Sequence, residues 1–89
     1  MPNVTTPSET ADPYNAAIAE VFRMRKVEKR LTFEALEVLT GINLRTLKRL
    51  INGQRAIMLG NFIKLCEALD EDPADVIRRS ADRVENTSS

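Results

Sequence analysis

Four basic or amide side chains recur along residues 41–53 at a spacing that would gather them on one face of a helix. At about 100° per residue, Arg45, Lys48, Arg49 and Asn52 fall on the same side of a helical wheel. No acidic residue interrupts the stretch. Surface helices usually mix signs because acid–base pairs four residues apart stabilise them. A helix face that carries only positive charge can bind an anionic partner, and we interpret this face as a nucleic-acid contact.

The other side of the same stretch is apolar, at the spacing of a helix that faces a core. Asn43 is a good N-cap before it, and Gly53 suits the left-handed position after a helix. The preceding Thr40, Gly41 and Ile42 predict a tight turn after another amphipathic segment, which is a helix-turn-helix arrangement. The apolar side chains predicted to face inward are Leu44, Leu47, Leu50 and Ile51.

The charge of the chain is balanced overall but divided along the sequence. The 89 residues contain 13 Lys and Arg and 13 Asp and Glu, which excludes a uniformly basic nucleic-acid binder. Residues 41–58 carry four bases and no acid, whereas residues 67–75 carry five acids and no base. This division predicts a dipolar molecule whose positive end meets phosphate.

Composition excludes several other kinds of site. One cysteine and no histidine rule out an internal disulfide or a Cys/His zinc cluster, and favour a reducing compartment. No apolar run reaches membrane length, and the amino terminus lacks the apolar segment of a signal peptide. No nucleophile–base pair, paired-carboxylate pocket or glycine-rich phosphate loop is present. We therefore expect a cytoplasmic, non-enzymatic protein with no metal, cofactor, small-molecule ligand or membrane partner.

Helical periodicity, short links and the absence of a strand pattern predict a compact all-α bundle of five helices. Residues 1–11 are polar and read as a flexible arm, residues 12–84 as the domain, and residues 85–89 as a frayed tail. The helices are expected at 13–30, 33–40, within 43–53, at 59–69 and from 73 to 80 or 84. Besides the residues above, the side chains expected to face inward are Tyr14, Ala17, Ile18, Val21, Phe22, Ala35, Leu36, Leu39, Leu59, Phe62, Ile63, Leu65, Cys66 and Leu69.

A longer register of residues resembles a known family. It comprises Leu31-Thr32, Leu36, Thr40-Gly41-Ile42, Thr46, Leu47, Arg49, Leu50, Asn52-Gly53, Arg55, Leu59, Lys64, Ala68, Leu69, Asp72, Asp75 and Val76. With this spacing, residues from about 22 to 79 resemble the Cro/phage-repressor type of helix-turn-helix domain, which has the λ-repressor-like fold. The resemblance implies that the third helix lies in the major groove of double-stranded DNA.

The resemblance also implies roles for individual residues. The first turns of the third helix would present side chains to base edges, and arginine is the residue best shaped to grip guanine O6 and N7. Residues at the start of the second helix and after the third would hold phosphates and position the domain. The implied base-reading residues are Asn43, Leu44, Arg45, Lys48 and Arg49, and the implied phosphate-positioning residues are Thr32, Asn52, Gln54 and Arg55.

Four residues depart from the family pattern, and one of them is Ile51, which stands where an acidic residue is common. Phe33 stands where the family usually has a glutamine that contacts the sugar-phosphate backbone. Glu37 replaces a small residue near the approach of the second and third helices, and we expect it to reach solvent or to pair with Arg45 or Lys48. Met58 replaces a Ser or Thr cap, which weakens the start of the fourth helix by about 1 kcal/mol if nothing substitutes for it.

The sequence therefore predicts a sequence-specific transcriptional regulator, a phage or prophage repressor of immunity or Cro-like type. Nothing remains for a ligand-sensing domain, so it would act by occluding its operator. Family members commonly dimerise, and the fifth helix is the expected surface. Two interpretations of Val76, Ile77, Ala81 and Val84 stay open, because these residues would form that interface or complete the monomer core.

Two alternative functions stay open. One is the antitoxin of a toxin–antitoxin pair, although the tails of this chain are short and polar for covering a toxin. The other is a protein-interaction module whose basic face meets an acidic partner. Discrimination among DNA duplexes separates such a module from a repressor.

Overall fold

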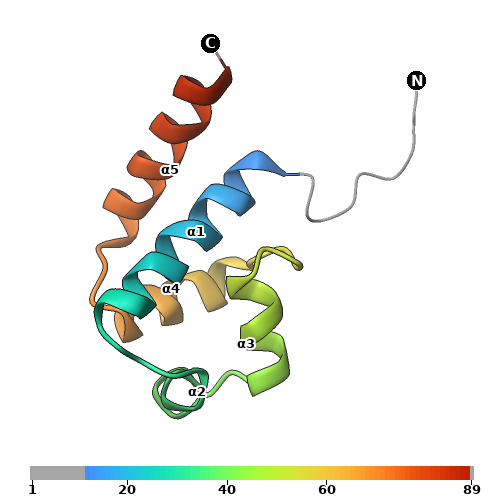
Figure 1. Ribbon diagram of the computed structural model, residues 1–89, viewed down its shortest axis with the longest axis vertical. Coiled ribbons are helices and arrows are strands. Elements are labelled where there is room, and N and C mark those ends of the chain that lie inside the picture. Colours follow the sequence, from blue (N-terminus) through green and yellow to red (C-terminus); the bar gives the residue numbers. More distant parts are fainter. Residues whose placement is uncertain (1–11, 89) are drawn as a thin grey trace, which may run out of the picture.

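The computed structural model describes residues 12–88, which form five α-helices joined by short turns (Figure 1). No strand occurs within that range, so the all-α prediction is confirmed. The arm predicted at residues 1–11 lies outside the described residues. The helices are α1 Pro13–Glu28, α2 Phe33–Thr40, α3 Leu44–Ile51, α4 Leu59–Ala68 and α5 Pro73–Ser88.

The starts of the helices follow local side-chain chemistry. Side-chain oxygens of Asp12, Thr32 and Asp72 accept hydrogen bonds from N–H groups in the first turns of α1, α2 and α5. Pro13 occupies the first position of α1, where a missing N–H costs nothing. Helix α4 begins after Met58, which provides no side-chain cap, as the sequence predicts.

Each of the helices α1 to α4 is followed by a residue with positive φ. Gly41 and Gly53 have φ of 74° and 75°, and Arg30 and Asp70 each have φ of 56°. The sequence predicts that this first helix ends at Arg30. Helix α1 instead ends at Glu28. The chain reverses there because the N–H of Leu31 donates to the carbonyl of Lys26 at 3.1 Å, which closes the end of the helix.

The core lies where α1 crosses the other helices, and Phe22 of α1 contacts Phe62 of α4 with ring centres 5.7 Å apart. Three side chains predicted to face inward are instead at least half exposed, namely Tyr14, Leu39 and Leu59, and Tyr14 and Leu59 lie in the first turns of α1 and α4. The buried core cluster comprises Val21, Phe22, Leu36, Ile42, Leu47, Leu50, Ile51, Phe62, Leu65, Cys66, Leu69 and Val76.

Helix α5 runs alongside α1 and its end points away from α2 and α3 (Figure 1). It continues to Ser88, past residue 85, where the sequence predicts the start of a frayed tail. Near this end, Arg83 forms an ion pair with Glu20 of α1 at 2.6 Å. Val84 is half-buried beside it.

Candidate nucleic-acid interface

The turn between α2 and α3 is built by the hydroxyl group of Thr40. This hydroxyl donates to the carbonyl of Leu36 at 2.7 Å and accepts from the N–H of Ile42 at 3.1 Å. Gly41 adopts the left-handed conformation that lets the chain turn at once. These contacts join α2 and α3 in the helix-turn-helix arrangement that the sequence predicts.

Helix α3 has only eight residues, too few to be stable alone, so its position depends on contacts with the rest of the domain. Leu47, Leu50 and Ile51 are fully buried, which confirms the predicted apolar face. At its start, the side-chain oxygen of Asn43 accepts from the N–H groups of Arg45 at 2.9 Å and Thr46 at 3.4 Å. The predicted N-cap is therefore confirmed.

A contact from α2 also fixes the start of α3. The carboxylate of Glu37 accepts a hydrogen bond from the N–H of Leu44 at 3.0 Å. Of the two expectations for Glu37, an ion pair with Arg45 or Lys48 does not form within residues 12–88, and the half-buried side chain keeps part of its surface in solvent. The free N–H groups at a helix start attract a carboxylate, and this attraction explains the observed partner.

The other end of α3 is held by α1. The guanidinium of Arg23 donates to the carbonyl of Ile51 at 2.8 Å. A cation at this position satisfies a carbonyl that the helix leaves unpaired and complements the helix dipole. Helix α3 is thus fixed at both ends and along its back, with its cationic face outward.

The outward face of α3 carries exposed cations at Arg45, Lys48 and Arg49. None of them, nor Arg55 in the loop beyond, belongs to an ion pair in the part of the chain that the structure describes. Unpaired cations on one face produce a local positive potential. This face is consequently available to an anionic ligand.

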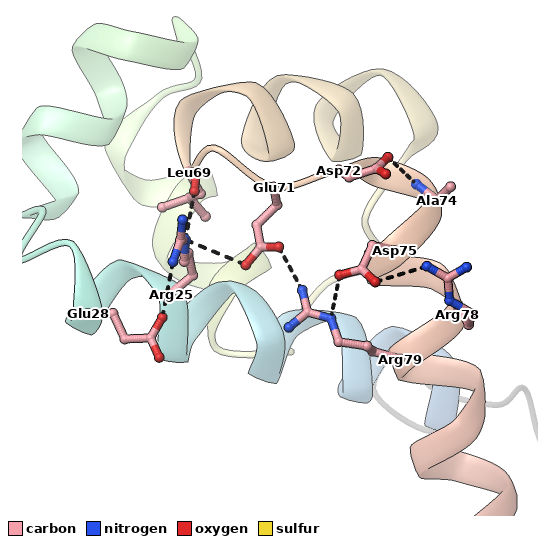
Figure 2. A network of polar contacts seen from close by, with 9 residues as sticks. All are labelled: Arg25, Glu28, Leu69, Glu71, Asp72, Ala74, Asp75, Arg78 and Arg79. Atoms are coloured by element: carbon pink, nitrogen blue, oxygen red, sulfur yellow. Dashed lines mark hydrogen bonds and ion pairs between the residues drawn. The ribbon is translucent and has the colours of Figure 1, made fainter.

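Two acidic residues near the start of α5, Glu71 and Asp75, instead form ion pairs within the domain (Figure 2). Glu71, whose side chain is only 11% exposed, pairs with Arg79 at 2.6 Å and with Arg25 at 3.6 Å. Arg79 also pairs with Asp75 at 3.0 Å. Glu71 and Asp75 are therefore paired with cations of α1 and α5 and not with those of α3.

A similar pair lies next to this network. The ammonium of Lys29 contacts Asp70 at 2.6 Å, and this hydrogen bond and charge lower the pKa of the Asp70 carboxyl below its ordinary value. Arg25 additionally donates to the carbonyl of Leu69 at the end of α4. Arg25 and Lys29 thus join the end of α1 to the segment between α4 and α5.

The loop after α3 is held by a residue that sequence reasoning missed. Asn15 of α1 is buried, donates to the carbonyl of Arg55 at 3.3 Å and accepts from the N–H of Ile57 at 2.9 Å. The sequence contains a signal for it, since Asn15 shares the helical face of Ile18 and Phe22. A polar side chain on an apolar stripe indicates a buried hydrogen-bonding partner.

The structure divides the predicted site residues among three places. Asn43, Leu44, Arg45, Lys48 and Arg49 come together on the cap and first turns of α3, with Leu44 half-buried. Thr32 lies at the start of α2, where its oxygen accepts from the N–H of Ala35. Exposed side chains of Asn52, Gln54 and Arg55 follow the end of α3.

The single cysteine of the chain, Cys66, is buried. Burial, followed by the charges of Glu71, Asp72 and Glu67, raises the pKa of the Cys66 thiol from 9.0 to about 11. In the described part of the chain, no group of three or more metal-ligating side chains occurs. Across residues 12–88, no helix combines the length and apolar character that a membrane span requires.

The short turn after α2, the anchored helix α3 and the cationic face of α3 define a helix-turn-helix DNA-binding domain. The sequence model of the Cro/C1-type HTH DNA-binding domain matches residues 23–82, and the chain belongs to this family. It is a DNA-binding transcription regulator whose partner is double-stranded DNA. A comparison with curated proteins finds no match.

Proposed function

We propose that the protein binds one short operator through the major groove and represses transcription by occluding it, as a phage or prophage repressor of immunity or Cro-like type. It would work in the bacterial cytoplasm or nucleoid, where its DNA lies. The observation that carries this proposal is the pair Arg45 and Arg49. Both are exposed, form no ion pair within residues 12–88, and lie one turn apart on a helix whose opposite face is buried.

Arg45 and Arg49 are the principal base-reading residues of this proposal. Side chains four residues apart on a helix are neighbours, and each guanidinium can donate to O6 and N7 of a guanine. The other predicted residues flank them. Leu44 can touch a thymine methyl with its exposed part, and Asn43 keeps its amide N–H₂ for a base while its oxygen caps α3.

The remaining site residues position the domain on the sugar-phosphate backbone. Thr32 lies at the start of α2, where free backbone N–H groups favour an anion, and its hydroxyl proton is left to donate. Beyond α3, Asn52, Gln54 and Arg55 would contact phosphates of the same groove. These contacts supply affinity that depends on salt and not on sequence.

We also propose a homodimer formed through α5. Val76 is fully buried in the core, so it does not belong to this surface. Ile77 is half exposed at an apolar hollow that it lines with Ile18 and Leu59, while Ala81 and Val84 are half-buried. A dimer would place two copies of α3 about 34 Å apart on one face of DNA. Sedimentation equilibrium tests the assembly, and a mass of one chain at micromolar concentration contradicts it.

The experiment that tests the proposed function is selection of bound duplexes from a random pool, followed by titration of the selected and a scrambled duplex. A repressor is expected to bind its selected site in the nanomolar range and random DNA in the micromolar range or weaker. A palindromic motif would support the dimer. Equal affinity for selected and scrambled duplexes would favour a protein-interaction module and contradict the repressor.

A further inference from the structure

Phe33, the first residue of α2, lies between lysines of two other helices. The ammonium of Lys26 in α1 is 4.3 Å from the centre of its ring, and the ammonium of Lys48 in α3 is 5.9 Å from the same centre. Both distances fall within the reach of about 6 Å over which a ring face attracts a cation. Phe33 is half-buried and packs against the core, so its ring has a fixed position.

Neither lysine is neutralised by an acid. Across residues 12–88, Lys26 and Lys48 belong to no ion pair, in contrast to Lys29 three residues further along α1. Two like charges beside one ring repel each other, and the ring only partly offsets this repulsion. Both ammonium groups are therefore available to anionic ligands such as phosphates.

We propose that Phe33 is a platform that holds Lys26 and Lys48 as a paired contact for phosphates of one DNA strand. This inference rests on the proposed function and deepens it. Lysine is a compact charge that binds phosphate as a point, without the planar fork that grips a base edge. Because its ammonium lies over the Phe33 ring at the start of α2, Lys48 contacts the backbone and not the bases, although it shares a face with Arg45 and Arg49.

The platform has two consequences for recognition. Base reading on α3 is concentrated in Arg45 and Arg49, with Lys48 turned toward the start of α2. The interface also extends beyond the helix-turn-helix, because Lys26 brings α1 to the DNA. Phe33 acts as a positioning residue that itself donates no hydrogen bond.

The test compares Lys26→Ala, Lys48→Ala and Phe33→Leu with wild-type protein, using Lys64→Ala in α4 as a control that removes the same charge. Each platform lysine variant is expected to reduce the slope of log affinity against log salt by about 0.9. Each should weaken the selected and the scrambled duplex by the same factor. Phe33→Leu keeps both charges, so it should retain most of the slope while affinity falls about two- to fivefold.

Nuclear magnetic resonance of the free protein checks the platform without DNA. The ε-methylene protons of Lys26 and Lys48 should be shifted upfield by the ring, and Phe33→Leu should remove both shifts. Absence of these shifts in the folded wild type contradicts the platform. The same spectra show that each variant is folded before its affinity is measured.

The DNA results separate this inference from the proposed function. A wild-type protein that selects no duplex refutes both. A wild type that selects a site, with lysine variants that keep its full salt dependence, refutes the phosphate contact alone. A changed base preference in Lys48→Ala would make Lys48 a base-reading residue and overturn the inference.

Discussion

The carboxylate of Glu37 in α2 accepts a hydrogen bond from the backbone N–H of Leu44, the first residue of α3, at 3.0 Å. The bond joins the two helices across their turn and neutralises part of the positive end of α3. Together with the Asn43 cap and the Arg23 contact at the far end, it fixes the angle at which α3 presents its cationic face.

Replacing Glu37 tests this tie. Glu37→Ala removes the acceptor and leaves the N–H of Leu44 unpaired, so the free energy of unfolding should fall by about 1–2 kcal/mol. Glu37→Gln keeps an oxygen acceptor without the charge and should recover more than half of that loss. Urea unfolding measures both variants, and an alanine variant as stable as wild type would show that the bond contributes nothing.

Arg45 and Arg49 are expected to determine the base preference. Arg45→Ala or Arg49→Ala should cost about 1–3 kcal/mol of binding at the selected site and flatten its preference at one position. Arg78→Ala is a matched control, because it removes one positive charge on α5, where Arg78 pairs with Asp75. Unchanged motifs from both α3 variants in duplex selection would reject their base-reading role.

Asn15 is expected to support DNA binding without touching DNA. Asn15→Leu keeps the size of the side chain but loses both hydrogen bonds to the loop of Arg55 and Ile57. Two partly buried backbone groups would lose their partner, so stability should fall by about 1–3 kcal/mol.

Affinity of the Asn15 variant for selected and scrambled duplexes should fall together, because the loop carries Arg55, a phosphate contact. Thermal unfolding and titration at one salt concentration measure the two effects. A loss restricted to the selected duplex would contradict the positioning role of Asn15.

The thiol of Cys66 should be unreactive in the folded protein. Its pKa is raised from 9.0 to about 11, so at pH 8 the thiolate fraction is lower than in the unfolded chain by roughly a hundredfold. Labelling with a disulfide reagent, with and without denaturant, measures the difference. Equal rates in both conditions would show an accessible thiolate.

The same shift predicts a pH dependence of stability. The folded state holds the thiol proton more tightly than the unfolded state. The stability gained from the protonated Cys66 thiol is therefore complete below pH 9 and is lost as the pH rises toward 11. Cys66→Ala should lack this part of the decline. An identical pH profile in the variant and the wild type would assign the decline to other groups.

The sequence was sufficient to predict features that depend on neighbouring residues. Helix α2 has the predicted bounds, and the Asn43 cap, the Gly41 turn and the buried Leu47 follow from periodicity and backbone chemistry. The cationic face of α3 was predicted in the same way. Its residues are exposed where the helical wheel placed them.

Contacts between distant segments could not be predicted in this way. Asn15 meets the loop near Arg55 only because α1 crosses that loop, and the spacing along the chain contains no record of this crossing. For Glu37 the sequence predicts solvent or a cation as the partner of the carboxylate, because a buried unpaired carboxylate is costly. In the structure this carboxylate accepts a hydrogen bond from the N–H of Leu44, at the start of the helix seven residues further along the chain.

The central claim, that α3 reads bases in the major groove, is tested most directly by methylation interference on the selected duplex with dimethyl sulfate. This reagent modifies guanine at N7, in the major groove, and adenine at N3, in the minor groove. We expect N7 methylation of particular guanines to block wild-type binding, and Arg45→Ala or Arg49→Ala to lose that sensitivity. Interference confined to adenine N3, with free tolerance of methylated guanine, would contradict the account.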